Sequence, residues 1–258
     1  MAEIAAEQSG EILRDQVAIV TGGGSGLGRA IGRALARNGA SVVLVGRRSD
    51  VLASTADEIG PHAHIAVQDI CRLAELPDLV SLVERIAGPP TILIHCAGNH
   101  LKRDVVGTTD EEFAAVLMTH VQASFALSRL VIPHMRRAGG GSILFIASMT
   151  SFIGMPLVAA YSAAKSAMLG LVRSMAVELG PDNIRVNAIA PGWVETDMLR
   201  TAFAGDPIRE GRALARTPLG RFGDPDEIGE AALYLSSGRA SFVTGVCLPV
   251  DGGGLIGY

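Results

Sequence analysis

Short runs of β-branched and other apolar residues alternate along the chain with longer amphipathic segments. The apolar runs lie at residues 17–20, 41–45, 64–67, 91–94, 142–147, 184–190 and 242–250. The first of these runs are almost wholly apolar, which is typical of strands covered on both faces. Strands that alternate with helices favour a parallel sheet, and right-handed crossovers then place helices on both of its faces. The sequence therefore predicts an α/β fold with a seven-stranded, doubly wound parallel sheet, whose ligands gather at the carboxyl ends of the strands.

The composition is that of one soluble domain. The 258 residues are 48 % hydrophobic and 19 % charged, and they contain no repeat, low-complexity block or Pro/Ser-rich linker. We expect residues 15–258 to form a single domain behind a flexible N-terminal lead-in at 1–14. The net charge of −4 gives no basic footprint for nucleic acid, and no run approaches the roughly 18 apolar residues of a membrane span. Because the N-terminus is acidic where a signal peptide would be basic, we expect a cytoplasmic protein.

The cysteines and histidines show no disulfide or metal-binding pattern. Cys71, Cys96 and Cys247 are odd in number, widely scattered and without a CxxC spacing, which favours small buried or half-buried thiols. His62 and His64 are close together, but they follow a Gly-Pro pair and no acidic cluster accompanies them. A loop or strand edge is the simpler interpretation of these two histidines. The sequence therefore predicts no metal site.

A glycine-rich turn follows the first apolar run. Gly22, Gly26 and Gly28 lie between that run and an amphipathic segment that reads "GRAIGRALARNG". Glycines allow a tight turn and let backbone N–H groups approach a pyrophosphate, to which the helix N-terminus adds its partial positive charge. Turns from strand to helix also favour glycine for steric reasons alone. The combination of strand, turn and helix predicts a nucleotide-binding loop.

Tyr161 and Lys165 lie four residues apart in a run of small helix formers, "AAYSAAKSA". On a helix this spacing puts both side chains on one face, about 5–6 Å apart at Cβ. A packing tyrosine beside an exposed lysine would explain the pair in isolation. A phenol that moves a proton near neutral pH needs its pKa lowered from about 10 by roughly 3 units, or about 4 kcal/mol, and a nearby ammonium supplies part of that. Downstream of the glycine-rich turn, the pair predicts an acid–base site.

Several motifs, in order along the chain, resemble those of the classical short-chain dehydrogenase/reductase family. They are "TGGGSGLG", "YSAAK", "IRVNAIAPGWVETDM", "GRFGDPDEIGEAALYLSSGRASFVTG" and "VDGG", and the match runs from about residue 15 to the C-terminus. The resemblance implies a single-domain Rossmann fold and an NAD(P)-dependent oxidoreductase that transfers a hydride between a nicotinamide and a ketone or secondary alcohol. Because the cofactor supplies the hydride chemistry, the protein must position the substrate and handle the proton.

The resemblance implies four catalytic positions. Tyr161 would be the acid–base, and Lys165 would lower its pKa and hold the nicotinamide ribose. Ser148, thirteen residues before the tyrosine, would bind the substrate oxygen as charge develops on it. The fourth position departs from the family, because His120 stands where many members carry an asparagine. Three interpretations stay open: the imidazole relays a proton, only the backbone carbonyl is needed, or His120 packs beneath the site.

The resemblance also implies the cofactor contacts. They are Gly22, Ser25, Gly26, Leu27, Gly28, Arg47, Asp69, Ile70, Ala97, Gly98, Tyr161, Lys165, Pro191, Gly192, Val194 and Thr196. Gly46 stands where a carboxylate would select NAD, and the Arg47 guanidinium beside it suits a 2′-phosphate. Ser25, where many NADP-preferring relatives carry a basic residue, and the nearby Asp50 point the other way. We expect NADP(H) to be preferred, with NAD(H) as the alternative.

A second departure follows the fourth apolar run, where the family's usual "NNAG" reads "HCAG". Ala97 and Gly98 keep the close approach to the adenosine ribose that the resemblance implies. His95 and Cys96 replace amides that normally connect neighbouring strands, so the sequence leaves the hydrogen bonding at this point open.

Two segments are expected to flank the substrate: a lid at about 197–220 and the stretch 98–113. Arg200, Arg209 and Arg212 in the lid either meet a carboxylated substrate or are ordinary solvated side chains. The two segments look most like those of the gluconate 5-dehydrogenase and polyol dehydrogenase branch of the family. A sugar acid or a polyol is therefore the expected small-molecule substrate.

Two alternative functions follow from the same resemblance. A 3-oxoacyl-[acyl-carrier-protein] reductase shares the framework motifs, and Arg136 and Arg137 are a faint hint of the basic surface that an acidic carrier protein requires. A non-catalytic nucleotide-binding sensor or scaffold is the alternative of another class, against which the retained serine, tyrosine and lysine argue.

The segments 112–135 and 161–179 are apolar on more than one face, and the family is commonly tetrameric, so a homotetramer is expected.

Overall fold

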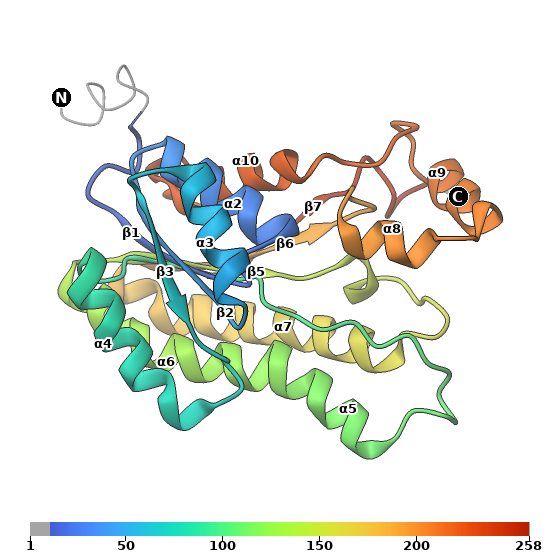
Figure 1. Cartoon of the computed structure of the whole chain (residues 1–258), viewed down its shortest axis with the longest axis horizontal. Coiled ribbons are helices and arrows are strands. Elements are labelled where there is room, and N and C mark those ends of the chain that lie inside the picture. The colour runs from blue at the N-terminus through green and yellow to red at the C-terminus, as the bar shows by residue number, and fades with distance from the viewer. Residues whose placement is uncertain (1–10, 258) are drawn as a thin grey trace.

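Seven parallel strands form a single sheet in the computed structural model, which describes residues 11–257. The strands lie in the order β3-β2-β1-β4-β5-β6-β7 (Figure 1). Their bounds are β1 Val17–Thr21, β2 Ser41–Gly46, β3 Ala63–Val67, β4 Ile92–His95, β5 Gly141–Ile146, β6 Ile184–Pro191 and β7 Cys247–Val250. The predicted doubly wound sheet is confirmed. The strand order reverses between β1 and β4, the point at which such sheets bind ligands outside their carboxyl ends.

Helices cover both faces of this sheet (Figure 1). The α-helices are α2 Gly26–Arg37, α3 Ser49–Ile59, α4 Leu76–Ala87, α5 Asp110–Leu117, α6 Ala123–Arg137, α7 Ala159–Leu179, α8 Asp197–Phe203, α9 Pro207–Arg216 and α10 Pro225–Ser236. A π-helical turn, η2, spans Met118–Gln122, and 3₁₀ turns span η1 Leu73–Glu75, η3 Met149–Ser151, η4 Gly180–Asp182 and η5 Gly238–Ala240. Helix α2 packs against α10 and α3, whereas α4 packs against α6 and α5 against α7.

Alternate residues of the central strands belong to two separate hydrophobic cores. Ile19 and Val43 belong to the core beneath α4, α6 and α7, and Val20 and Leu44 belong to the core beneath α2 and α10. All four side chains are fully buried. A strand whose two sides both meet apolar layers needs no polar residue, and this explains the apolar runs of the sequence.

Three predicted elements differ from the structure. The run 242–250 contributes only Cys247–Val250 to β7, because its pairing with β6 begins at Cys247. Strand β3 lies at the edge of the sheet, so Ile65 and Val67 are 36 % and 53 % exposed rather than covered. The long apolar stretch 112–135 is not one regular helix, since the π-helical turn η2 interrupts it between α5 and α6.

The beginning of the described chain packs on the domain. Leu13, which we expected in the lead-in, is buried, and its N–H donates to the Asn38 carbonyl at 2.8 Å. Of the expected lead-in at 1–14, residues 1–10 lie outside the described residues.

One helical stretch, Asp110–Arg137, is long and apolar enough to cross a membrane by length and composition, with a mean hydropathy of 1.4. It comprises α5, η2 and α6, which pack against α4 and α7, and 44 % of the apolar window is buried inside the molecule. Core helices commonly have this composition, so the stretch is weak support for a membrane span.

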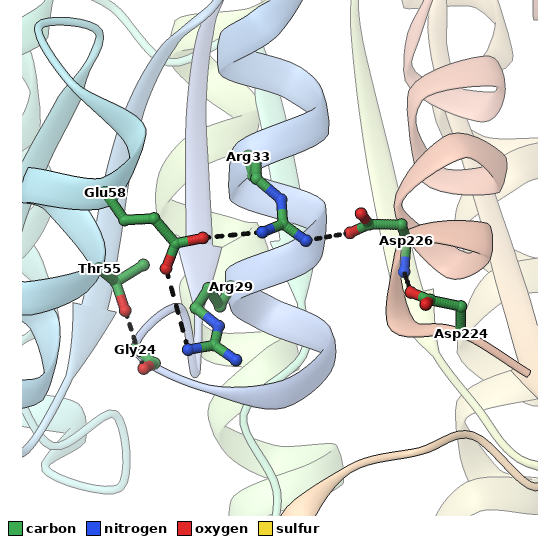
Figure 2. A network of polar contacts seen from close by, with 7 residues as sticks. All are labelled: Gly24, Arg29, Arg33, Thr55, Glu58, Asp224 and Asp226. Atoms are coloured by element: carbon green, nitrogen blue, oxygen red, sulfur yellow. Dashed lines mark hydrogen bonds and ion pairs between the residues drawn. The ribbon is translucent and has the colours of Figure 1, made fainter.

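The glycine-rich turn is connected to its neighbouring helices through a polar network (Figure 2). Arg33 on α2 donates to Glu58 on α3 at 2.7 Å and forms an ion pair with Asp226 on α10. Thr55 Oγ1 on α3 donates to the Gly24 carbonyl at 2.9 Å. These contacts fix the turn and helix α2 relative to the sheet.

Candidate active site

The glycine-rich turn lies between β1 and α2, with glycines where no side chain fits. Gly22 has φ +71°, and a Cβ there would come within 2.8 Å of the Ala97 Cα. A Cβ on Gly28 would lie 2.1 Å from the Gly22 carbonyl oxygen. Ser25 is the N-cap of α2 but accepts no hydrogen bond with its side chain, so the first N–H groups of α2 have no side-chain cap. An open helix N-terminus of this kind favours an anion.

A cleft of about 250 Å³ adjoins this turn at the carboxyl ends of the strands. Seven of the predicted cofactor residues line it, namely Gly22, Ser25, Arg47, Asp69, Ile70, Ala97 and Gly98. The sequence analysis missed Arg48, Gln68, Asn99 and Thr119, which line the cleft as well. Those four residues come from four separate segments, so only the tertiary structure brings them to the same cleft.

The turn after β4 is held through Thr21 rather than through amide side chains. Thr21 Oγ1 donates to the Ile94 carbonyl at 3.2 Å and accepts from the N–H groups of Cys96 and Ala97, each at 3.1 Å. The His95 side chain takes no part in these bonds and instead shares a 2.8 Å hydrogen bond with the Ser128 hydroxyl on α6. Burial lowers the pKa of His95 to about 3, so this imidazole is neutral and structural. These bonds answer the question that the "HCAG" departure left open.

Ser148, Tyr161 and Lys165 meet just beyond β5. Ser148 follows that strand, and its hydroxyl accepts from the Thr150 N–H at 3.1 Å. Tyr161 lies in the first turn of α7 and forms a side-chain hydrogen bond with Ser148. The Lys165 ammonium is buried, donates to the Ile146 carbonyl at 2.5 Å, and lies 5.4 Å from the centre of the Tyr161 ring. The structure thus brings together the three residues that the sequence separates by thirteen and four positions.

Burial shifts the pKa values of the acid–base pair in opposite directions. It raises the pKa of Tyr161 to about 12, and the hydrogen bond with Ser148 offsets only part of that rise. It lowers the pKa of Lys165 to about 8. Both shifts favour the neutral form, as desolvation requires. The effect of Lys165 on the pKa of Tyr161 during the reaction therefore stays a prediction.

His120 lies in the π-helical turn η2, buried against Gly98 and Asn99. Its Nε2 lies 2.8 Å from the Asn99 carbonyl oxygen and 3.3 Å from the Asn99 nitrogen. A Cβ on Gly98 would meet the His120 Cε1 at 2.4 Å. The ring stands edge-on to Tyr161 at 5.5 Å, and its Nδ1 is buried without a hydrogen-bond partner within residues 11–257. Burial, reinforced by the positive charge of Lys165, lowers the pKa of His120 to about 3, so the imidazole is neutral.

The predicted nicotinamide contacts follow β6. Pro191 ends the strand, and a Cβ on Gly192 would come within 2.6 Å of the Asp251 Cα. Val194 is buried and forms a bridge with Gly223. The Thr196 hydroxyl caps α8, and its Cγ2 lies 3.6 Å from where a Gly26 Cβ would stand. Pro191, Gly192, Val194 and Thr196 thus follow the carboxyl end of β6, and Thr196 reaches the glycine-rich turn. Leu27 packs partly on the core at the start of α2.

Helices α8 and α9 form the segment that we expected to be a lid. Phe203 at the end of α8 packs between Trp193 and Phe222, at ring distances of 5.5 and 5.7 Å. The Arg209 guanidinium on α9 lies 5.7 Å from the Phe203 ring. Arg200 on α8 pairs with Asp197 at 3.0 Å, and both side chains are mostly exposed.

A larger cavity, of about 760 Å³, lies at the opposite end of the sheet, lined by Glu11, Arg14, His62 and Thr91 among others. It adjoins the amino ends of the strands, whereas ligands of such sheets bind at the carboxyl ends. Within residues 11–257, no group of three or more His, Cys, Asp and Glu side chains is arranged to hold a metal ion. The carboxyl-end cleft, together with Ser148, Tyr161 and Lys165, which do not line it themselves, is the candidate active site.

Comparison with known proteins identifies the family of the chain. The family described as enoyl-(acyl carrier protein) reductase matches residues 22–254. The 3α-hydroxysteroid dehydrogenase of Mediterraneibacter gnavus is 38 % identical over 93 % of this chain and 97 % of its own length. The gluconate 5-dehydrogenase of Gluconobacter oxydans is 36 % identical over 92 % of this chain and 93 % of its own length. The chain belongs to the short-chain dehydrogenase/reductase family and is an oxidoreductase.

A solved structure supports the same conclusion for the fold. It is a Beutenbergia cavernae protein described as an NAD(P)-dependent gluconate 5-dehydrogenase, with NADP bound at low occupancy. It is 37 % identical to this chain, covers 95 % of it and 98 % of its own length, and superposes with a TM-score of 0.88. The relatives act on different substrates by name, so family membership defines the reaction class and not the substrate.

Proposed function

We propose that the protein is an NAD(P)-dependent oxidoreductase that interconverts a ketone and a secondary alcohol. The observation that carries the proposal is the convergence of Ser148, Tyr161 and Lys165 at the carboxyl edge of the sheet, beside the cleft of the glycine-rich turn. A sensor or scaffold would not need a hydroxyl, a phenol and an ammonium in contact. A bound nicotinamide would supply the hydride chemistry.

Each of the three side chains has a distinct task in this proposal. The Ser148 hydroxyl hydrogen-bonds the substrate oxygen and stabilises the charge that develops on it. The Tyr161 hydroxyl gives its proton to that oxygen in reduction and accepts a proton from the alcohol in oxidation. Lys165 is anchored to the Ile146 carbonyl and holds its ammonium beside the phenol. The neutral His120 holds Asn99 and is a positioning residue, since its bonds go to backbone atoms.

The cleft fits a dinucleotide with a 2′-phosphate. Gly22 and Gly28 let the chain turn tightly at places where protein backbone leaves no room for a Cβ, and the N-terminus of α2 that follows has no side-chain cap, which suits a pyrophosphate. Arg47 and Arg48 both line the cleft with exposed side chains. A guanidinium binds a phosphate bidentately, whereas a hydroxyl gains less from it. We therefore propose NADP(H) as the preferred cofactor, with NAD(H) as the alternative.

A sugar acid or polyol is the substrate class that we propose. The two gluconate-associated relatives support it, and the segment α8–α9 carries Arg200, Arg209 and Arg212. The alternative is a 3-oxoacyl-[acyl-carrier-protein] reductase, which the reductase of that name from Thermotoga maritima, 32 % identical over 93 % of this chain, supports. In the structure, Arg136 pairs with Asp182 at 2.7 Å, so one of the two arginines that would meet a carrier protein is partly neutralised.

The assembly that we propose is a cytoplasmic homotetramer. Apolar side chains are exposed on two separate surfaces, with Phe113 and Phe125 on α5 and α6, and Phe242 and Val246 beside the edge strand β7. Two separate apolar surfaces suit two different two-fold contacts. The three cysteines are free thiols, which is usual in a reducing compartment.

The test is a substrate panel measured by cofactor absorbance near 340 nm, with NADP⁺ and NAD⁺ for the alcohols and NADPH and NADH for the carbonyl compounds. The panel contains sugar acids, polyols, simple ketones and a 3-oxoacyl thioester. We expect turnover of a hydroxy acid or polyol with NADP⁺, and Tyr161→Phe should lower kcat by about 10²- to 10⁴-fold while cofactor affinity stays within threefold.

The control for that variant is Tyr234→Phe, which removes a half-exposed phenol far from Ser148 and should leave kcat unchanged. Full activity of Tyr161→Phe would refute the acid–base assignment. Cofactor binding without turnover of any compound in the panel would favour the sensor or scaffold instead.

A further inference from the structure

The last described residues, 251–257, form a compact turn that we call the C-terminal turn. Asp251 follows β7 directly, and its carboxylate accepts two hydrogen bonds, Oδ1 from the Gly253 N–H at 2.9 Å and Oδ2 from the Leu255 N–H at 2.7 Å. The Asp251 carbonyl accepts a third, from the Gly254 N–H at 3.0 Å. Charge-assisted bonds from a carboxylate to backbone N–H groups are strong and local. Asp251 therefore determines the shape of the C-terminal turn.

The C-terminal turn lies against the end of helix α9 (Figure 1). Arg216, the last residue of α9, donates from Nε to the Gly254 carbonyl at 3.0 Å. The Leu219 N–H, three residues further along, donates to the Gly252 carbonyl at 3.2 Å. A Cβ on Gly252 would lie 2.8 Å from the Thr217 Cγ2, so the two chains are in close contact. The turn thus holds both the end of α9 and the chain that leaves it.

The same turn also lies against the loop that carries Ser148. Met149 follows Ser148, begins the turn η3 and is only 3 % exposed. A Cβ on the buried Gly254 would come within 3.1 Å of the Met149 Sδ, so no space separates the C-terminal turn from that side chain. The Met149 carbonyl accepts from the Phe152 N–H at 2.9 Å, which closes η3. Met149 therefore connects the C-terminal turn with the serine loop.

The backbone of Asp251 meets a third segment, the one that follows β6. The Gly192 N–H donates to the Val250 carbonyl at 3.0 Å, and a Cβ on Gly192 would come within 2.6 Å of the Asp251 Cα. Segments that follow β5, β6 and α9 thus meet at one turn. A displacement of about 1 Å at a reacting group costs about 100-fold in rate, so a contact that fixes such segments relative to one another affects the reaction.

We propose that the C-terminal turn is a clamp that holds the end of α9 against the loop of Ser148, and that Asp251 is the positioning residue that shapes this clamp. The inference rests on the proposed function in one respect, because Ser148 is taken there to bind the substrate oxygen. It gives the "VDGG" motif, which the proposed function leaves unused, a role in the reaction.

The experiment compares wild type with Asp251→Ala, which removes both carboxylate acceptors, and Asp251→Asn, which keeps one. The matched control is Asp182→Asn, which removes a partly buried carboxylate, paired with Arg136, just before β6 begins at the opposite end of that strand. Hydrogen exchange measured by mass spectrometry reports the protection of peptides 148–153 and 210–220 in the cofactor-free protein. Initial rates give KM and kcat for the substrate found in the panel, and NADPH fluorescence gives the cofactor affinity.

We expect Asp251→Ala to speed exchange in both peptides by at least tenfold, to lower kcat by about 10- to 100-fold and to raise the KM of the substrate. The affinity for NADPH should stay within fivefold. Asp251→Asn should show smaller changes of the same kind, and it provides the answer if Asp251→Ala does not fold. Asp182→Asn should leave the exchange of both peptides and kcat within twofold of wild type.

Other outcomes overturn the inference and are distinguishable from a failure of the proposed function. Unchanged exchange in either peptide, with or without faster exchange inside residues 252–257, would overturn the clamp. Unchanged kcat and KM, or a loss of NADPH affinity as large as the loss of kcat, would overturn the positioning role of Asp251. If wild type turns over no compound of the panel, the proposed function fails, and the exchange of the two peptides by itself decides whether the clamp exists.

Discussion

At the scale of single residues, the site is organised by desolvation. Burial raises the pKa of Tyr161 to about 12 and lowers that of Lys165 to about 8, because it penalises the charged form of each group. Near neutral pH the phenol therefore keeps its proton, while Lys165 is still mostly an ammonium.

The depressed pKa of Lys165 has a consequence for stability. The unfolded chain holds this proton up to the ordinary pKa of 10.5, whereas the folded protein releases it from about 8. Between these values the unfolded state binds more protons, so the contribution of Lys165 to the free energy of unfolding rises with pH, by up to about 1.4 kcal/mol per pH unit. Below pH 8 both states are protonated and the contribution is constant.

Urea unfolding of cofactor-free wild type and Lys165→Met, followed by the fluorescence of Trp193, measures this term. The wild-type free energy of unfolding should rise relative to that of the variant from pH 8 to pH 9, a range that ends before Tyr161 titrates. Parallel curves for the two proteins would show that Lys165 has an ordinary pKa.

Gly98 and His120 are complementary in shape, and the three nearest atoms to a Cβ on Gly98 all belong to His120. We expect Gly98→Ala to destabilise the protein by about 1–3 kcal/mol, because the buried imidazole has nowhere to move. The double variant Gly98→Ala/His120→Ala should regain much of that loss, as measured by thermal unfolding.

Gly22→Ala is the comparison for that cycle. Its Cβ would meet the backbone of Ala97, and its φ is positive, so His120→Ala should not rescue it. If Gly98→Ala is no better tolerated without His120, the contact between the two residues is not what excludes a side chain at position 98.

At the scale of elements, helix α2 begins directly after the glycine-rich turn that lines the cleft, and polar contacts on both sides hold the helix. Arg33 bridges α3 and α10 through Glu58 and Asp226, as Figure 2 shows. Arg29, one turn earlier, lies 3.9 Å from the same Glu58. The Arg33 side chain is 24 % exposed and that of Arg29 is 49 % exposed, so solvent screens the second pair more strongly.

We expect Arg33→Met to lower the free energy of unfolding by about 1–2 kcal/mol and Arg29→Met by less than about 0.5 kcal/mol. Denaturant titration at low and high salt measures both, and the loss for Arg33→Met should shrink at high salt. Equal losses of unfolding free energy in the two variants would mean that the ion pair of Arg33 with Asp226 on α10 does not stabilise the protein.

At the scale of the whole molecule, the strand β7 lies at one edge of the sheet. Strand β7 pairs with β6 alone, and the side chain of Phe242, shortly before it, is fully exposed. An apolar aromatic side chain in water beside an open sheet edge is a typical feature of a contact between subunits.

If this edge is a subunit contact, Phe242→Asp should lower the mass of the particle in solution, as measured by sedimentation or light scattering, from four chains to two. The control is Val106→Asp, which places the same charge at an equally exposed apolar residue in the loop between β4 and α5. A wild-type protein that sediments as one chain would contradict the proposed assembly.

Much of this architecture could be predicted from the sequence, because local patterns encode it. The apolar runs predict the strands, since a buried parallel strand has no polar side. The glycines between β1 and α2 predict the turn, since backbone contacts at Gly22 and Gly28 exclude any Cβ. The spacing of Tyr161 and Lys165 predicts a shared helix face, since helical geometry is local. The family motifs then indicate Ser148.

Other features depend on contacts between distant segments. The place of β3 at the edge of the sheet depends on how the strands are ordered. The same order brings His120 against Asn99 and the His100 ring to 5.0 Å from that of Tyr161. The pKa values of Tyr161 and Lys165 depend on burial, which cannot be read from the spacing of the two residues in the sequence. The sequence by itself determined the elements and the chemical groups, because periodicity and side-chain chemistry are local properties. Only the tertiary structure decided the solvation and the neighbours of those groups, because both arise when segments far apart in the chain exclude water together.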